Sequence, residues 1–255
     1  MPENQTTPYL ASSFFHHFTK PPSQKTRLTQ FHPDELSACA KQETFRLSDL
    51  PKLLALKDSK DLALLLTRAK EMTQQRFGSI INLFAPLYVS NYCASSCTYC
   101  GFSTEVRQKR ITLTLPEIER EAQVLKEKGF RQVLIVSGEF KAKNKVEYFR
   151  EIVARLSGLF DSVLIEIQSL TVEEYKELYS AGLDGVTIYQ EVYDPQAYSV
   201  FHQKGAKSDY RCRLEAPERI AEAGIPAVNL GILLGLNEWQ EEVLYLARHL
   251  DYLLK

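Results

Sequence analysis

The chain has 255 residues, of which 44% are hydrophobic and 25% are charged, as in an ordinary globular protein that can bury a sizeable core. Its 31 lysines and arginines nearly balance its 32 aspartates and glutamates, so the net charge of −1 excludes strong electrostatic attraction to nucleic acid or an anionic membrane. We expect a cytoplasmic protein, because the sequence has no apolar run of about 18 residues and its start lacks the regions of a secretory signal.

The first part of the chain, residues 1–78, is predicted to be an N-terminal arm followed by helices. Residues 1–45 have weak periodicity and several turn-forming residues, which favours an arm with short helical pieces. Residues 47–58 and 59–77 carry apolar residues at helical spacing, and Ser59 is the predicted N-cap of the second helix. The pattern changes after Gly78, so we expect a second region over residues 79–255.

In this second region, apolar β-type segments alternate with amphipathic helical segments. Thr114 and Glu117 have the spacing of a capping box at the start of one helix. The predicted strands are 79–89, 131–137, 162–167, 184–190 and 226–234, and the predicted helices are 114–128, 145–157, 171–181, 208–223 and 238–254. Five alternating strand–helix units predict an α/β fold with a parallel sheet. The order of the elements does not separate an open doubly wound sheet from a barrel.

Three of the five cysteines, Cys93, Cys97 and Cys100, follow the first predicted strand directly. An odd number of cysteines grouped in this way does not indicate a disulfide framework, whereas thiolates are the usual protein ligands of iron–sulfur clusters. Three thiolates for four irons leave one iron open to a cofactor or substrate. The alternatives are a structural zinc site, which usually takes four ligands in paired spacings, and three unrelated buried cysteines. The loop also leaves the carboxyl end of a strand, where active sites of α/β proteins lie.

The spacing Cys-x3-Cys-x2-Cys, with the aromatic Tyr99 before the last cysteine, resembles the signature of radical S-adenosylmethionine (SAM) enzymes. Other segments resemble the 2-iminoacetate synthases, the tyrosine lyases of thiamine thiazole biosynthesis. The tyrosine lyases of [FeFe]-hydrogenase maturation share much of the same pattern. The segments that carry this resemblance are 75–78, 85–103, 137–139, 184–186, 189–191, 215–219 and 231–236.

The resemblance implies a fold, two cofactors and a reaction. The fold is a partial (β/α) TIM-type barrel of about five strand–helix units with a helical N-terminal extension. The cofactors are a [4Fe-4S] cluster on the three cysteines and SAM, which is cleaved to methionine and a 5′-deoxyadenosyl radical. The implied reaction cleaves the Cα–Cβ bond of L-tyrosine to 2-iminoacetate (dehydroglycine) and p-cresol. The implied partners are a flavodoxin- or ferredoxin-type reductant and a thiazole synthase.

Two strand ends carry residues that the resemblance associates with SAM, in addition to Tyr99. Gly138 and Glu139 end the second predicted strand and resemble the element that binds the SAM amino group. A carboxylate can accept hydrogen bonds from an ammonium, and a glycine lets backbone come close. Glu166 and Gln168 bracket the end of the third strand, where relatives often contact SAM. A structural ion pair is the alternative for Glu166.

The last two predicted strands supply further candidates for cofactor binding. Gln190 and Glu191 end the fourth strand, and Lys207 and Arg213 flank the start of the following helix, where a cation can pair with the SAM carboxylate. Gly231 lies on the fifth predicted strand, which relatives place against adenine, and a strand bulge is the alternative.

Full-length relatives continue with further strands, so we expect this chain to be a C-terminally shortened member. Three functions therefore stay open from the sequence. The first is an active tyrosine lyase that a second polypeptide completes. The second is an inactive or split fragment that binds a cluster or SAM without turnover. The third is a radical SAM enzyme that acts on another substrate.

Overall fold

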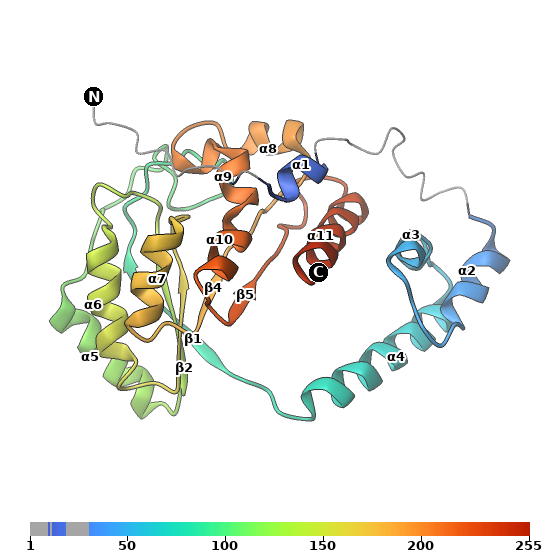
Figure 1. Ribbon diagram of the computed structural model, residues 1–255, viewed down its shortest axis with the longest axis horizontal. Coiled ribbons are helices and arrows are strands. Elements are labelled where there is room, and N and C mark those ends of the chain that lie inside the picture. The colour runs from blue at the N-terminus through green and yellow to red at the C-terminus, as the bar shows by residue number, and fades with distance from the viewer. Residues whose placement is uncertain (1–9, 11, 19–30) are drawn as a thin grey trace. The chain divides into compact units, whose positions relative to one another are not determined.

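The computed structural model describes residue 10 and residues 12–18 and 31–255 (Figure 1). Much of the arm predicted over residues 1–45 therefore lies outside the described residues. Contacts divide the chain into two compact units, one formed by residues up to 17 together with 83–237 and the other by 18–82 together with 238–255. These units are defined by contacts alone, so the boundary between residues 78 and 79 stays a prediction.

The larger unit is built on a five-stranded parallel sheet in which the strands follow their order in the chain, β1-β2-β3-β4-β5. The strands are β1 (Phe84–Ser90), β2 (Gln132–Ser137), β3 (Ser162–Glu166), β4 (Gly185–Thr187) and β5 (Ala227–Asn229). A doubly wound sheet reverses its strand order at a switch point, whereas a barrel adds each strand next to the previous one. The observed order is that of a partial β/α barrel, which resolves the choice that the sequence left open.

Helices α5, α6 and α7 lie along one face of this sheet (Figure 1), and α10 packs against α7 and β5. The helices of this part are α5 (Leu115–Glu127), α6 (Val146–Leu156), α7 (Val172–Ser180), α8 (Pro195–Phe201), the 3₁₀ helix η2 (Ala206–Ser208), α9 (Tyr210–Leu214) and α10 (Ala216–Glu222). The core forms where alternate strand residues, such as Ile135 and Ile165, meet apolar helix faces that carry Phe149 and Ile152. All four side chains are fully buried.

The two helix starts that were predicted from capping residues differ in outcome. At α5 the prediction is confirmed, because the Glu117 carboxylate accepts a hydrogen bond of 2.7 Å from the backbone N–H of Thr114. At α4 (Ser59–Phe77) the predicted N-cap is wrong: the cap is Asp58, whose carboxylate accepts from the N–H groups of Lys60 and Asp61. Asp58 precedes Ser59 with extended backbone, and its negative charge suits the positive end of the helix.

Several predicted elements differ from the structure. The first strand begins at Phe84 rather than at residue 79, and the helix expected over 47–58 is the 3₁₀ helix η1 (Leu47–Asp49) followed by α3 (Leu50–Leu54). The helix expected over 208–223 is two helices, α9 and α10, separated at Glu215, because Pro217 lacks an N–H and cannot continue the α9 hydrogen-bond pattern. The fourth and fifth strands are shorter than predicted, so Gly231 lies beyond β5 and Glu191 beyond β4. Glu191, four residues past the end of β4, has a φ of 68°, a left-handed conformation that a regular strand does not contain. Helix α8, which begins at Pro195, was not predicted.

The second compact unit is helical. Its elements are α2 (Pro33–Ala40), η1 (Leu47–Asp49), α3 (Leu50–Leu54), α4 and α11 (Trp239–Leu253), while α1 (Phe14–Phe18) ends at the first residue of this unit. Helix α11 contacts α3 and η1, and its His249 is buried, which lowers the pKa of the imidazole to about 4. Within the described residues, no helix has both the length and the apolar character that a membrane span requires.

Candidate functional site

The three clustered cysteines lie on the loop that leaves the carboxyl end of β1. Cys97 is buried, and Cys93 and Cys100 are half-buried. The sulfur of Cys93 accepts a hydrogen bond of 3.4 Å from the backbone N–H of Ser95, and the sulfur of Cys100 accepts one of 3.3 Å from Phe102. These two hydrogen bonds fix the positions of the sulfur atoms relative to the loop backbone, which is the arrangement that ligands of an iron–sulfur cluster need.

Gly138, which follows β2, packs directly against the start of the cysteine loop. A Cβ atom at this position would lie 2.4 Å from the carbonyl oxygen of Tyr92 and 2.9 Å from the Cβ of Cys93. The two segments are also joined by a hydrogen bond of 2.8 Å from the N–H of Ala94 to the carbonyl oxygen of Glu139. A glycine is needed here because the backbones approach closer than any side chain allows.

Asn144, a buried residue that the sequence did not single out, ties three loops together. Its side-chain Nδ2 donates to the carbonyl oxygens of Gly138 at 2.8 Å and Tyr92 at 3.3 Å. Its own carbonyl oxygen accepts a hydrogen bond of 2.7 Å from Nε2 of Gln168. The loops after β1, β2 and β3 therefore meet at this one residue, through its side chain and its backbone carbonyl, and the Gln168 amide nitrogen is used to hold Asn144.

The opposite side of the cysteine loop is held by the segment between α8 and η2. The N–H of Ser96 donates to the carbonyl oxygen of Lys204 at 3.1 Å. Gly205 has a φ of 84°, and a Cβ there would lie 2.3 Å from the carbonyl oxygen of Ala94. The cysteine loop is thus clamped between two glycine contacts, one after β2 and one after α8. No motif in the sequence marked this second contact.

Tyr99, between the last two cysteines, is oriented by His202. Its hydroxyl lies 2.7 Å from Nε2 of His202, whose Nδ1 lies 2.9 Å from the carbonyl oxygen of Tyr198. A carbonyl oxygen only accepts, so Nδ1 carries the proton and Nε2 accepts from the Tyr99 hydroxyl. Burial, assisted by the charge of Lys207, lowers the pKa of His202 to about 4, and burial raises the pKa of Tyr99. Both groups are therefore neutral near neutral pH.

Four of the predicted SAM-binding residues form two ion pairs. Arg213 donates to a carboxylate oxygen of Glu139 at 2.7 Å, and Lys207 donates to Glu191 at 2.7 Å. Arg213 also donates to the carbonyl oxygen of Tyr189 at 2.8 Å. Burial is the largest single influence on the Arg213 guanidinium and works to lower its pKa, but the charges of Glu139 and Glu191, together with nearby tyrosines, outweigh it, so the net pKa shift is upward. Each cation of the site is thus held by an acid of the protein.

Glu166 is the last residue of β3, and Gly231 lies just beyond the end of β5. Burial raises the pKa of Glu166, and the charge of Glu191 adds to the shift. A Cβ at Gly231 would lie 2.7 Å from the ring of Tyr189, and the carbonyl oxygen of Gly231 accepts from the N–H of Glu191 at 3.3 Å. Gly231 is therefore needed for the approach of a tyrosine ring.

The three cysteines could in principle hold a single metal ion or an iron–sulfur cluster, and these two groups need different arrangements of ligands. In the described part of the chain, no three His, Cys, Asp or Glu side chains are grouped as ligands of a metal ion. A cubane cluster makes a different demand, because each of three thiolates binds a different iron. Burial raises the pKa of the Cys97 thiol to about 12, so cluster binding there must displace a proton.

Comparison with known proteins gives consistent results. Residues 87–250 match the Radical SAM superfamily. The chain is 44% identical over 206 residues to 2-iminoacetate synthase of Escherichia coli (strain K12), a match that covers 80% of this chain and 55% of that protein. The FeFe-hydrogenase maturase HydG from Carboxydothermus hydrogenoformans is 31% identical with a TM-score of 0.81, over 86% of this chain and 52% of that one. The chain spans about half the length of the curated relatives it matches.

Proposed function

Because this chain belongs to the radical SAM superfamily, we propose that it holds a [4Fe-4S] cluster on Cys93, Cys97 and Cys100 and binds SAM at that cluster. The residues present fit the cluster. The donor set is three thiols on one short loop, two of the sulfurs accept backbone N–H groups, and the loop is clamped on both sides. When bound, the cluster supplies the electron that cleaves SAM to methionine and a 5′-deoxyadenosyl radical.

We propose that the carboxylate of Glu139 binds the amino group of SAM. This carboxylate lies near the cysteine loop, since its charge adds to the effect of burial in raising the pKa of the Cys97 thiol, and it is held in place by Arg213 at 2.7 Å. Gly138 gives the close approach that such a contact requires. A carboxylate that is fixed by a buried guanidinium can accept from an ammonium without moving, which favours binding because little conformational entropy is lost.

The remaining predicted cofactor residues receive supporting roles in this proposal. Tyr99 is kept neutral and oriented by His202, so its ring forms one wall beside the cluster. Lys207 and Glu191 are kept as a mutually neutralised pair, and Glu166 stands near Glu191 with a raised pKa. The other proposed contacts are Gln168, through the Asn144 clamp, and Gly231, through the backbone next to Tyr189.

For the reaction, we propose radical cleavage of the Cα–Cβ bond of L-tyrosine to 2-iminoacetate and p-cresol. The observation that supports it is the 44% identity to a 2-iminoacetate synthase over 80% of this chain. We further propose that a flavodoxin- or ferredoxin-type protein supplies the electron and that a thiazole synthase uses the product. A reducing cytoplasm suits these roles and the five free cysteines.

The test is product analysis under anaerobic conditions. The chain is reconstituted with iron and sulfide and incubated with SAM, dithionite and L-tyrosine. Formation of 5′-deoxyadenosine together with p-cresol supports the proposal. Formation of 5′-deoxyadenosine alone would support cofactor cleavage but contradict the tyrosine lyase assignment.

The matched controls are cysteine variants. The triple variant Cys93→Ala, Cys97→Ala, Cys100→Ala should lose iron and the cleavage of SAM together. Cys39→Ala, which removes a buried thiol in the other compact unit, should lose neither. Retention of the cluster in the triple variant would refute the assignment of the ligands.

A further inference from the structure

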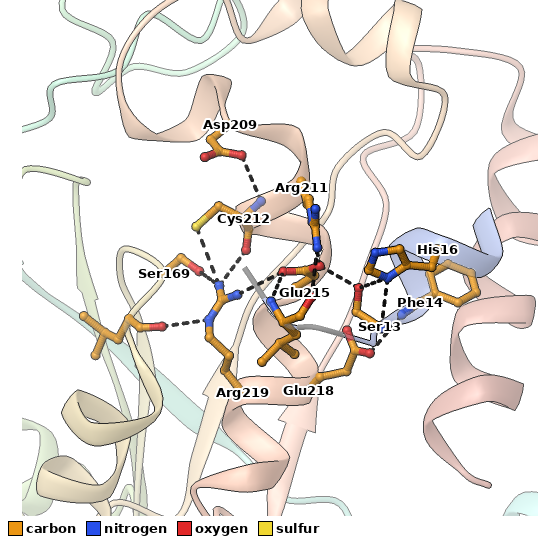
Figure 2. Close-up of polar contacts among 12 residues, drawn as sticks. Ser13, Phe14, His16, Ser169, Asp209, Arg211, Cys212, Glu215, Glu218 and Arg219 are labelled. Carbon is orange, nitrogen blue, oxygen red and sulfur yellow. Dashed lines mark hydrogen bonds and ion pairs between the residues drawn. The ribbon is translucent and has the colours of Figure 1, made fainter. Parts of the chain in front are cut away.

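Leu10, Ser13 and Phe14 lie against helices α9 and α10 (Figure 2). The backbone N–H of Leu10 donates to Oε2 of Glu215 at 3.0 Å, although the two residues are 205 positions apart. The hydroxyl of Ser13 donates to Oε1 of Glu215 at 2.5 Å, and the N–H of Phe14 donates to Glu218 at 2.9 Å. We refer to Leu10, Ser13 and Phe14 as the N-terminal strap.

Glu215 is the residue on which the strap converges. It is fully buried and lies at the junction of α9 and α10. Its other partners are Arg211, at 2.8 Å, and Arg219, at 3.9 Å. A buried carboxylate must have its hydrogen bonds made by the protein, and the strap supplies two of the donors. Without the strap, this carboxylate would keep its charge partners but lose those two hydrogen bonds.

Helix α9 depends on contacts outside itself. It has five residues, which is too short for a helix to be stable by its own hydrogen bonds. Its first turn is fixed by Arg211, which donates to the carbonyl oxygen of Leu10 at 2.9 Å, and by Tyr210, which donates to that of Tyr193 at 2.6 Å. Its position therefore depends directly on the strap.

On the other side, Arg219 of α10 binds the same helix to the barrel. It donates to the carbonyl oxygen of Cys212 at 2.6 Å, to Oγ of Ser169 at 2.9 Å and to the carbonyl oxygen of Leu170 at 3.0 Å (Figure 2). Helix α9 is thus held between the loop after β3 and the strap. It carries Arg213, which makes the 2.7 Å contact with Glu139.

We propose that the N-terminal strap positions the SAM site, because it fixes α9 through Glu215 and thereby sets the contact between Arg213 and Glu139. Ser13 and Glu215 are positioning residues, since neither touches the proposed cofactor and both act through Arg213. The part of the proposal that concerns SAM rests on the proposed function. The part that concerns α9 is a property of the chain alone.

The test uses Ser13→Ala and the matched control Ser12→Ala, which removes the hydroxyl of the neighbouring exposed serine. In the cluster-free full chain, hydrogen exchange followed by mass spectrometry reports on the amides of α9. Ser13→Ala should make these amides exchange roughly tenfold faster, because the loss of one hydrogen bond to a carboxylate lowers the cost of local opening by about 1.5 kcal/mol. Ser12→Ala should leave the exchange rates unchanged.

The second measurement is SAM affinity of the reconstituted chain, by equilibrium dialysis at matched iron content. Ser13→Ala should raise the dissociation constant about fivefold, equivalent to about 1 kcal/mol. In an Arg213→Gln background the same change should raise it less than about twofold, because the path from strap to cofactor is already broken. A structural role unrelated to Arg213 would weaken binding equally in both backgrounds.

The outcomes separate this proposal from the proposed function. If the amides of α9 exchange at an unchanged rate in Ser13→Ala, the N-terminal strap does not fix α9, whatever the chain binds. Faster exchange with an unchanged SAM dissociation constant would overturn its link to the SAM site. A wild-type chain that takes up iron but binds no SAM would refute the proposed function and, with it, the SAM part of this proposal.

Discussion

Replacing Gly138 by alanine tests how the cysteine loop is held. The new methyl group would lie 2.4 Å from the carbonyl oxygen of Tyr92, whereas ordinary contact begins at 3.4 Å, so the two segments must separate by 1.0 Å. That shift strains the hydrogen bond between Ala94 and Glu139. Overpacking of this kind costs about 1–3 kcal/mol, and each weakened hydrogen bond adds about 1 kcal/mol. We expect the cluster-free chain to lose about 2–4 kcal/mol of stability.

The main assay is iron and sulfide content after anaerobic reconstitution, together with urea unfolding of the cluster-free chain followed by circular dichroism. Gly138→Ala should retain less than about half of the wild-type iron, because Cys93 moves with Tyr92. The matched control is Gly101→Ala in the same loop, where no atom lies within 4 Å of the added Cβ. Wild-type iron content in Gly138→Ala, or equal losses of iron in both variants, would refute the idea that the contact between Gly138 and Tyr92 fixes the position of the cysteine loop.

Three further predictions concern other parts of the chain. Asn144→Asp places a carboxylate against two carbonyl oxygens, so iron content and SAM affinity should both fall severalfold. Wild-type iron content and wild-type SAM affinity in this variant would contradict the role of Asn144 in holding the loops together. His249 has its pKa lowered from 6.5 to about 4, so the unfolded chain binds a proton at higher pH than the folded one. Stability should thus fall by about 2 kcal/mol between about pH 7 and pH 5, and His249→Gln should remove that part of the dependence in thermal unfolding. Asp58→Ala should lower the stability of the helical unit by about 1 kcal/mol, whereas Ser59→Ala should have little effect, and a reversed order in urea unfolding would restore Ser59 as the cap.

The ion pairs bear on how the site recognises its cofactor. The sequence suggested that Lys207 and Arg213 offer free cations to a carboxylate, but each is held by an acid of the protein. A buried cation without a partner costs several kcal/mol, so pairing is the stable arrangement. In the proposed function, the carboxylate of Glu139 would receive the SAM ammonium while a fixed guanidinium holds it.

The sequence by itself determined the features that arise from neighbours along the chain. Periodicity predicted the order of five strands and their helices because the side chains of one face recur at fixed intervals. The capping box at Thr114 involves residues three positions apart, and the spacing of the cysteines places three thiols on one loop. Even a local prediction was wrong at Ser59, because the adjacent Asp58 is the N-cap of α4.

Only the tertiary structure showed which residues hold the cysteine loop and which residues surround it. Asn144, His202 and Gly205 reach the cysteine loop from segments 50 to more than 100 residues away, and no periodic pattern connects them to it. The barrel order of the strands likewise became visible only from their pairing. The pairing of Arg213 with Glu139 depends on a five-residue helix that the N-terminal strap contacts through Leu10. Such contacts arise from the folding of distant segments onto one another, so their energies leave no signal in any local stretch of sequence.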